Sequence, residues 1–194
     1  RSWLDHLKIR GSYGLVGSDK ISDNDADRFA YLQFYSGGSG YNFGIDQFGI
    51  GYSGLAEGNF ANPNLTWEKA RKLNIGLDAT LLKNRLSVSI DAFSEYRYDI
   101  ITGLSGGDKI GFPDIAGKDA PFINSGIVEN RGIDLEIGWN GRIGKNFRYY
   151  IKPNFTFARN KIKFMNEVTY DNEWRRNTGR RIGEHFVYVV DHFV

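Results

Sequence analysis

Residues 73–81 read Leu-Asn-Ile-Gly-Leu-Asp-Ala-Thr-Leu, a run in which apolar and polar side chains alternate without interruption. Alternation with a period of two places successive side chains on opposite faces of an extended strand. Residues 62–70, Asn-Pro-Asn-Leu-Thr-Trp-Glu-Lys-Ala, come just before and begin with residues typical of turns. This stretch therefore predicts a polar loop that leads into a strand with one apolar face and one polar face.

The same alternation recurs along the chain and predicts six strands. Their approximate ranges are 7–16, 69–82, 85–98, 127–140, 147 to at least 157, and 184–193, the last being the least regular. Strands of about 10 to 14 residues exceed the usual globular length of about 5 to 6 and are long enough to cross a bilayer at a tilt. Pro153 lies within the fifth range, where the loss of a backbone donor predicts a bulge or a local break.

The connections between these strands alternate between long and short. The long ones cover residues 17–64, 101–126 and 163–181, and the short ones are the tight turns at 83–84 and 141–146. Outer-membrane barrels have short turns at one end and long loops at the other. The chain is therefore predicted to be all-β: an antiparallel meander of about six long strands that forms part of a transmembrane β-barrel wall. Six strands make an open wall, because the smallest barrels need about eight.

The composition is compatible with this fold and excludes several other classes. The 194 residues are 41% hydrophobic and 25% charged, which is an ordinary average for a chain with one apolar and one polar face. No run of 18 apolar residues exists, so a transmembrane helix is excluded. A net charge of +2 with interspersed signs argues against a nucleic-acid partner, and the lack of cysteine removes disulfides and thiol chemistry. The start at Arg1 without signal-peptide features predicts an internal piece of a longer chain.

Three motifs in order resemble one known family. Residues 7–14 and 16–19 are similar to its L-K-x-R-x-S-Y-G-x-x-G-N/S-D segment. Residues 62–68 are similar to its N-P-N-L-x-W-E element, and residues 74–78 to the N-I-G-L-D strand that follows it. Residues 130–135 are similar to its N-R-G-I-E/D-L segment. The family is that of the SusC/RagA-type TonB-dependent outer-membrane transporters. The resemblance covers most of residues 4–160 and thins beyond them.

The resemblance implies that residues 1–194 form part of a transporter β-barrel, without plug domain or signal peptide in this segment. It implies uptake of a large nutrient, such as an oligosaccharide or peptide, across the bacterial outer membrane. The implied partners are membrane lipid, a SusD-like surface lipoprotein and TonB, the last two through other parts of the full-length protein. The alternative is a soluble all-β carbohydrate-binding module; an enzyme ranks third, and no cofactor is expected.

The two faces of the predicted strands carry different candidate residues. On the polar face, charges are expected to pair across strands and to line a lumen; the candidates are Lys8, Arg10, Asn74, Asp78, Asp134, Glu136, Arg148 and Lys152. On the other face, one continuous apolar surface is expected on the convex side of the wall, formed by Leu73, Ile75, Leu77, Leu86, Val88, Ile90, Ile133, Leu135, Ile137, Tyr149 and Ile151.

Aromatic residues point to the ends of the strands and to the first long loop. Trp67 and Trp139 are predicted to mark opposite membrane interfaces, with ordinary core packing as the alternative. The first long loop is rich in aromatic residues and Gly, a composition that suits stacking on sugar or peptide but also packing on other loops. The candidate extracellular contacts are Tyr35, Tyr41, Phe43 and Tyr52.

Other motifs are better explained by structural roles than by catalysis, cofactor binding or metal binding. Residues 49–54 fit G-x-G-x-x-G but neither follow a hydrophobic strand nor open a helix, so a flexible glycine loop is expected. Residues 23–27 begin like a calcium loop, but the required Gly and Glu are missing. His6, His185 and His192 are scattered, and the carboxylates of the polar face are better explained as ion-pair partners than as an acid/base pair. No catalytic, cofactor-binding or metal-ligating residue is assigned.

Overall fold

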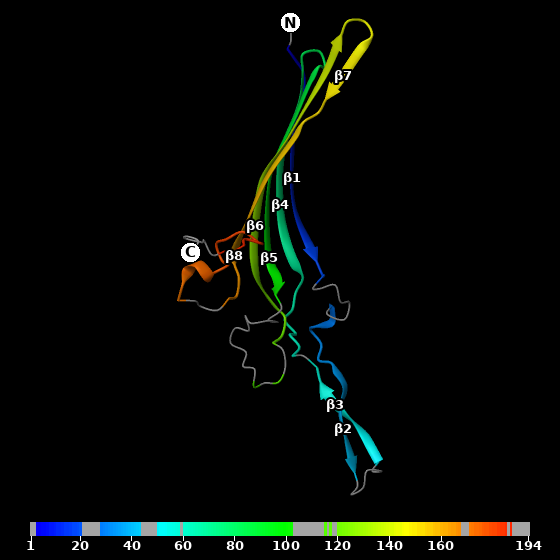
Figure 1. The fold of residues 1–194 in the computed structure, drawn as a ribbon, viewed down its shortest axis with the longest axis vertical. Helices are drawn as coiled ribbons and strands as arrows, with labels where there is room; N and C mark the ends of the chain where they lie inside the picture. Colours follow the sequence, from blue (N-terminus) through cyan, green and yellow to red (C-terminus); the bar gives the residue numbers. More distant parts are fainter. Residues whose placement is uncertain are drawn as a thin grey trace, which may run out of the picture.

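The computed structural model describes residues 3–20, 28–43, 50–58, 60–102, 115, 117, 120–167, 171–185 and 187. Within these residues the chain is built almost entirely from strands (Figure 1). The elements are β1 (Leu4–Ser18), β2 (Tyr35–Phe43), β3 (Ile50–Glu57), β4 (Glu68–Leu81), β5 (Leu86–Thr102), β6 (Ile123–Ile143), β7 (Phe147–Ile151), β8 (Asn154–Phe164) and a 3-10 turn (Glu173–Arg175). No helix in the described part of the chain is long and apolar enough to cross a membrane.

Six of the strands form one antiparallel sheet in the order β1-β4-β5-β6, and both β7 and β8 pair with the free edge of β6. The predicted meander is therefore confirmed. The sheet is a tall, curved wall in Figure 1, with the N-terminus and both short turns at one end. The longer connections leave from the other end, where β2 and β3 form a separate two-stranded sheet. The predicted asymmetry of long loops and short turns is confirmed.

The pairing register lines up residues of one kind in rows across the sheet. One row runs from Ile9 through Leu77, Ile90 and Leu135 to Phe155. The adjacent row is polar and consists of Lys8, Asp78, Ser89, Glu136 and Asn154. Because side chains alternate between faces, a slip of one residue would transfer every apolar side chain to the polar face. The alternation read from the sequence therefore excludes every slip by an odd number of residues.

The first long connection differs from its prediction as a loop. It contains the β2–β3 hairpin, with Tyr35 opposite Glu57 and Tyr41 opposite Tyr52. Residues 50–54, expected to be a flexible glycine loop, run inside β3, while Gly49 lies outside the described residues. Glycines and serines conceal the strand period here because they carry almost no hydrophobic signal, and backbone pairing alone defines this hairpin.

The last part of the chain contains one confirmed prediction and one that lies largely outside the described residues. At Pro153 the fifth predicted strand divides into β7 and β8, as a local break without a bulge, and Ile137 N–H still donates to the Pro153 carbonyl (3.1 Å). The predicted strand at 184–193 is not found at residues 184, 185 and 187, and its remainder lies outside the described residues. Instead, Gly179 N–H donates to the Ile162 carbonyl and Ile162 N–H to the Arg180 carbonyl, both at 2.8 Å.

The sheet has almost no protein interior. Among the described residues, only Ala70 and Ala120 are buried hydrophobic residues. Large apolar side chains of the strands are exposed instead, with Ile9 at 73% and Phe155 at 61% of their full accessibility. A soluble sandwich packs such side chains between two sheets. The apolar face of this sheet is not covered by described parts of the same chain.

Candidate functional site: two faces of one sheet and its loop end

The apolar face forms a continuous band across all the long strands. Neighbouring rows continue it, with Ile75, Ala92, Ile133 and Phe157 in one row and Leu81, Leu86, Trp139 and Ile151 in another. Along β6 the band extends from Ile133 to Ile143. At about 3.3 Å per residue and a tilt of about 40°, these ten steps rise about 25 Å, which is the height of the apolar band on a membrane barrel. The expectation of one continuous apolar surface is therefore met by the register.

The polar face is organised around Arg10 on β1. Its guanidinium donates through Nε and Nη2 to both carboxylate oxygens of Asp78 on β4, at 2.7 and 2.9 Å. The same Nη2 donates to Asp91 Oδ2 on β5 (2.9 Å). Ser89 completes the group by donating to Asp78 Oδ1 (2.7 Å). One cation therefore connects three neighbouring strands, which a planar guanidinium with several donors does better than an ammonium.

Gly76 on β4 leaves the space that this cluster needs. A Cβ at this position would lie 2.4 Å from Asp91 Oδ1 and 3.0 Å from the Arg10 guanidinium carbon. Asp91 Oδ1 is buried and has no hydrogen-bond partner. Asp91 also lies directly opposite Asp134 on β6. Two carboxylates therefore face each other at the side of the cluster toward β6.

All eight candidate lumen-facing residues fall on this polar face by register, but the structure brings only some of them together. Arg10 pairs with Asp78, and Lys152 with Glu136 (2.5 Å). No contact between Asn74 or Arg148 and this group is seen among the described residues. The sequence analysis missed Ser89 and Gly76 as parts of the cluster; their positions in the polar rows were the available signal. That this face lines a lumen remains a prediction.

The Asn-Pro-Asn-Leu motif has a structural role at the loop end of the sheet. Asn62 forms a turn in which its side chain accepts from Asn64 N–H (3.0 Å) and donates to the Phe122 carbonyl (2.8 Å). Asn124 at the start of β6 then accepts from Thr66 N–H (2.8 Å) and donates to the Thr66 carbonyl (2.7 Å). These bonds fasten the entrance of β4 to the start of β6, across β5. Sequence reasoning singled out the motif but missed Asn124, its partner.

An aromatic hollow of about 500 Å³ lies beside this turn. It is lined by Asp19, Arg28, Phe29, Tyr31, Pro63, Leu65, Thr66, Trp67 and Ile101. The four candidate contact residues are not in its lining and lie on the β2–β3 hairpin instead. Tyr35, Tyr41 and Tyr52 are exposed there, and the side chain of Phe43 lies outside the described residues.

The remaining sequence motifs add no chemical centre. Within the described residues, no three His, Cys, Asp or Glu side chains are placed to hold a metal ion. Residues 23–27 and His192 lie outside the described residues. Trp139 donates from Nε1 to the Tyr149 hydroxyl (3.4 Å) near the short turns, and Trp67 is exposed at the loop end. The two tryptophans therefore lie near opposite ends of the sheet, but their membrane role remains a prediction.

Long antiparallel strands with one exposed apolar face and one ion-paired face define a segment of a β-barrel that is not closed. The chain belongs to the family described as TonB dependent receptor-like, beta-barrel, whose model matches residues 2–192. Barrels of this family are outer-membrane proteins, and its members are receptors and transporters rather than enzymes.

Comparisons with individual proteins show which members of this family the chain is similar to. It is 29% identical to the TonB-dependent receptor SusC of Bacteroides thetaiotaomicron and 28% identical to a TonB-dependent receptor of Formosa agariphila, over 82% of this chain in each case. It covers only 15% and 14% of their lengths. Among solved structures, the RagAB peptide importer in its closed-closed state matches with a TM-score of 0.66 and 26% identity. That match covers 85% of this chain and 16% of the importer chain.

Proposed function

We propose that this chain is part of the wall of an outer-membrane transporter that takes up a large nutrient such as an oligosaccharide or a peptide. The observation that carries the proposal is the exposed apolar band, about 25 Å high, on a sheet that buries almost no hydrophobic residue of its own. Lipid is the solvent in which such a face is stable. The names of the similar proteins, among them a peptide importer, support transport as the activity.

In this proposal the polar face lines the lumen and the loop end lies outside the cell. The Arg10–Asp78–Asp91 cluster and the Lys152–Glu136 pair then hold neighbouring strands together where water has access. TonB acts through other parts of the full-length protein, and so does a SusD-like lipoprotein, apart from the contact considered below for the β2–β3 hairpin. The carbohydrate-binding alternative has less support, because the large apolar strand residues face away from any described protein core.

The β2–β3 hairpin is the proposed contact of this segment with substrate or with the lipoprotein. It carries exposed Tyr35, Tyr41 and Tyr52 on a two-stranded sheet beyond the loop end of the wall (Figure 1). Exposed tyrosines present a flat apolar ring with a hydroxyl, which suits both sugar stacking and protein contact.

The hairpin can be removed cleanly, because Gly58 N–H donates to the Phe34 carbonyl (2.8 Å) and closes its base. In the full-length transporter, residues 35–57 are replaced by Asn-Gly, which forms a tight hairpin turn. Tyr41→Ala with Tyr52→Ala serves as the matched variant that keeps the hairpin backbone. Uptake of labelled oligosaccharides and peptides and co-purification of the lipoprotein are measured for both.

The results separate the possible roles. Loss of uptake with normal co-purification assigns the hairpin to the substrate, and loss of both assigns it to the lipoprotein. Normal values for both would contradict a contact role for the hairpin. Insertion into lipid vesicles, followed by the change in electrophoretic mobility that folded barrels show on heating, tests the wall itself. A protein that stays out of the vesicles would refute the proposed membrane location.

A further inference from the structure

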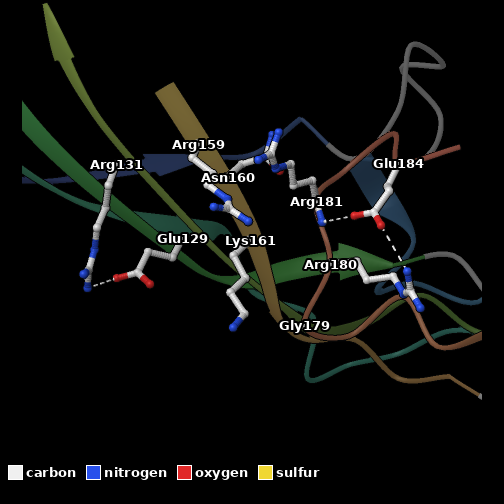
Figure 2. Close-up of a pocket in the computed structure, with 9 residues that line it drawn as sticks. All are labelled: Glu129, Arg131, Arg159, Asn160, Lys161, Gly179, Arg180, Arg181 and Glu184. Carbon is white, nitrogen blue, oxygen red and sulfur yellow. Dashed lines mark hydrogen bonds and ion pairs between the residues drawn. The ribbon is translucent and has the colours of Figure 1, made fainter. Parts of the chain in front are cut away.

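A second hollow, of about 560 Å³, lies beside β8 at the loop end of the sheet (Figure 2). Its walls are the ends of β6 and β8 and the segment that returns along β8 after the 3-10 turn. It is lined by Glu129, Arg131, Arg159, Asn160, Lys161, Gly179, Arg180, Arg181 and Glu184. Five cationic side chains thus face two carboxylates.

Both carboxylates are already engaged by cations of the hollow or its rim. Glu184 Oε1 accepts from Arg180 Nη1 (3.0 Å), and Oε2 accepts from Arg181 N–H (3.3 Å). The hydrogen bond from the backbone N–H of Arg181, followed by that from Arg180, holds the pKa of Glu184 below its usual value. Glu129 is shared between Arg131 and Lys163, the latter at 2.9 Å. The hollow therefore keeps a surplus of positive charge.

The surplus positive charge of the hollow is concentrated on β8. Neither Arg159 nor Lys161 has a carboxylate partner among the described residues. Arg159 also lies directly opposite Arg131 on β6. Like charges in this position repel each other and weaken strand pairing, unless an anion lies between them. The arrangement is what an anion-binding site requires.

The register also fixes which face the hollow occupies. Arg131 and Arg159 form the row next to Ile133 and Phe157, two residues further along each strand and on the same face. At about 3.3 Å per residue, the two guanidinium-bearing positions begin about 7 Å beyond the apolar band. On β6 and β8 the cations therefore follow directly after the last apolar residues, while the same row continues with Ser94, Leu73 and Tyr13 on β5, β4 and β1.

Aromatic side chains accompany cations on the neighbouring strands one and two same-face rows further toward the loop end, where Arg71 lies opposite Tyr96 and Lys69 opposite Tyr98. On this face Lys69 Nζ lies 5.7 Å and the Arg71 guanidinium 5.0 Å from the centre of the Tyr98 ring. A belt of aromatic and basic residues next to an apolar band is typical of the level of lipid headgroups. The hollow lies beside this belt, at the β8 edge of the sheet.

We propose that this hollow binds the phosphate of a lipid headgroup in the membrane leaflet on the long-loop side. The proposal rests on the membrane location argued above. Arg131 and Arg159 supply planar donors that match phosphate oxygens, and Lys161 supplies a compact charge. The bound phosphate relieves the repulsion across β6 and β8 and fixes this edge of the wall at the headgroup level.

The test uses the full-length transporter in detergent, with diphosphoryl lipid A as the probe and native mass spectrometry as the measurement. Arg159→Gln combined with Lys161→Gln is expected to weaken lipid A binding about tenfold or more, because two charged contacts are lost. The conservative pair Arg159→Lys with Lys161→Arg is expected to keep most of the binding. Lys145→Gln with Arg148→Gln removes the same charge at the short-turn end and is expected to leave binding unchanged.

Two comparisons on the unaltered protein complete the test. They decide between the outcomes even when the glutamine variant does not fold. Lipid A stripped of its phosphates is expected to bind at least about tenfold more weakly, and equal binding would overturn the proposal. Inorganic phosphate at equal concentration is expected to leave lipid A bound; displacement would assign the site to free phosphate. Vesicle insertion is measured in parallel. If the protein inserts normally but binds lipid A equally well with and without its phosphates, the result refutes this site and not the membrane wall.

Discussion

The two faces of the six-stranded sheet share one backbone but serve opposite environments. On one face, side chains such as Ile9 and Phe155 are exposed, and no described part of the chain covers them. On the other, Arg10 joins β1, β4 and β5 through carboxylates. The difference shows that this sheet is stabilised by lateral hydrogen bonds and cross-strand pairs rather than by a buried core. In the proposed transporter wall, the apolar surface faces lipid and the ion-paired surface faces water.

The strongest way to break this difference is to place a charge in the middle of the apolar band. Ile137→Arg in the full-length transporter is expected to lower barrel stability by about 2 to 4 kcal/mol, because a guanidinium near the bilayer midplane loses its hydration. Asn74→Arg on the polar face is the matched control and is expected to cost less than about 1 kcal/mol. Folding into lipid vesicles at increasing urea concentration measures both. Similar losses for the two variants would contradict the assignment of the faces.

A smaller effect is expected when a larger side chain is introduced at a tightly packed glycine of the polar face. A Cβ at Gly132 would lie 2.6 Å from the Phe157 carbonyl oxygen and within the space of the Phe93 ring. Gly132→Val is therefore expected to destabilise the sheet by about 1 to 3 kcal/mol, through displacement of backbone and ring. Gly14→Val, also on the polar face, meets nothing within 4 Å and serves as control. The same urea titration compares them, and equal midpoints would show that Gly132 is not a packing requirement.

The smallest effect is expected when the central cation of the polar face, Arg10, is replaced. Arg10→Gln removes the cation shared by Asp78 and Asp91 and is expected to lower the urea midpoint, because two neighbouring carboxylates lose their partner. Arg10→Lys is expected to recover part of the loss, since an ammonium cannot make the same forked contact. Arg148→Gln, on the same face but outside the cluster, is the control. If all three variants unfold alike, the cluster does not hold the strands together.

The long strands and their faces were predictable, whereas several local features were not. Residues 73–81 alternate so regularly that the strand and its two faces follow from the sequence. The β2–β3 hairpin was missed because Gly37, Gly38 and Gly40 contribute no hydrophobic signal, and the strand predicted at 184–193 was inferred from weak alternation. The aromatic hollow around Phe29 and Tyr31 was missed because its walls come from segments distant in the sequence.

By itself, the sequence determined the class of fold: alternation with a period of two sets which side chains share a face, and the spacing of turns sets which strands are neighbours. The tertiary structure alone decided which charges meet. Arg10 and Asp91 are 81 positions apart, and only the register across β4, with the space left by Gly76, brings them within 2.9 Å. The opposition of Arg131 and Arg159 likewise depends on how β8 aligns with β6. A periodic pattern is local and survives a slip by an even number of residues, whereas a contact between two particular side chains exists in one register only.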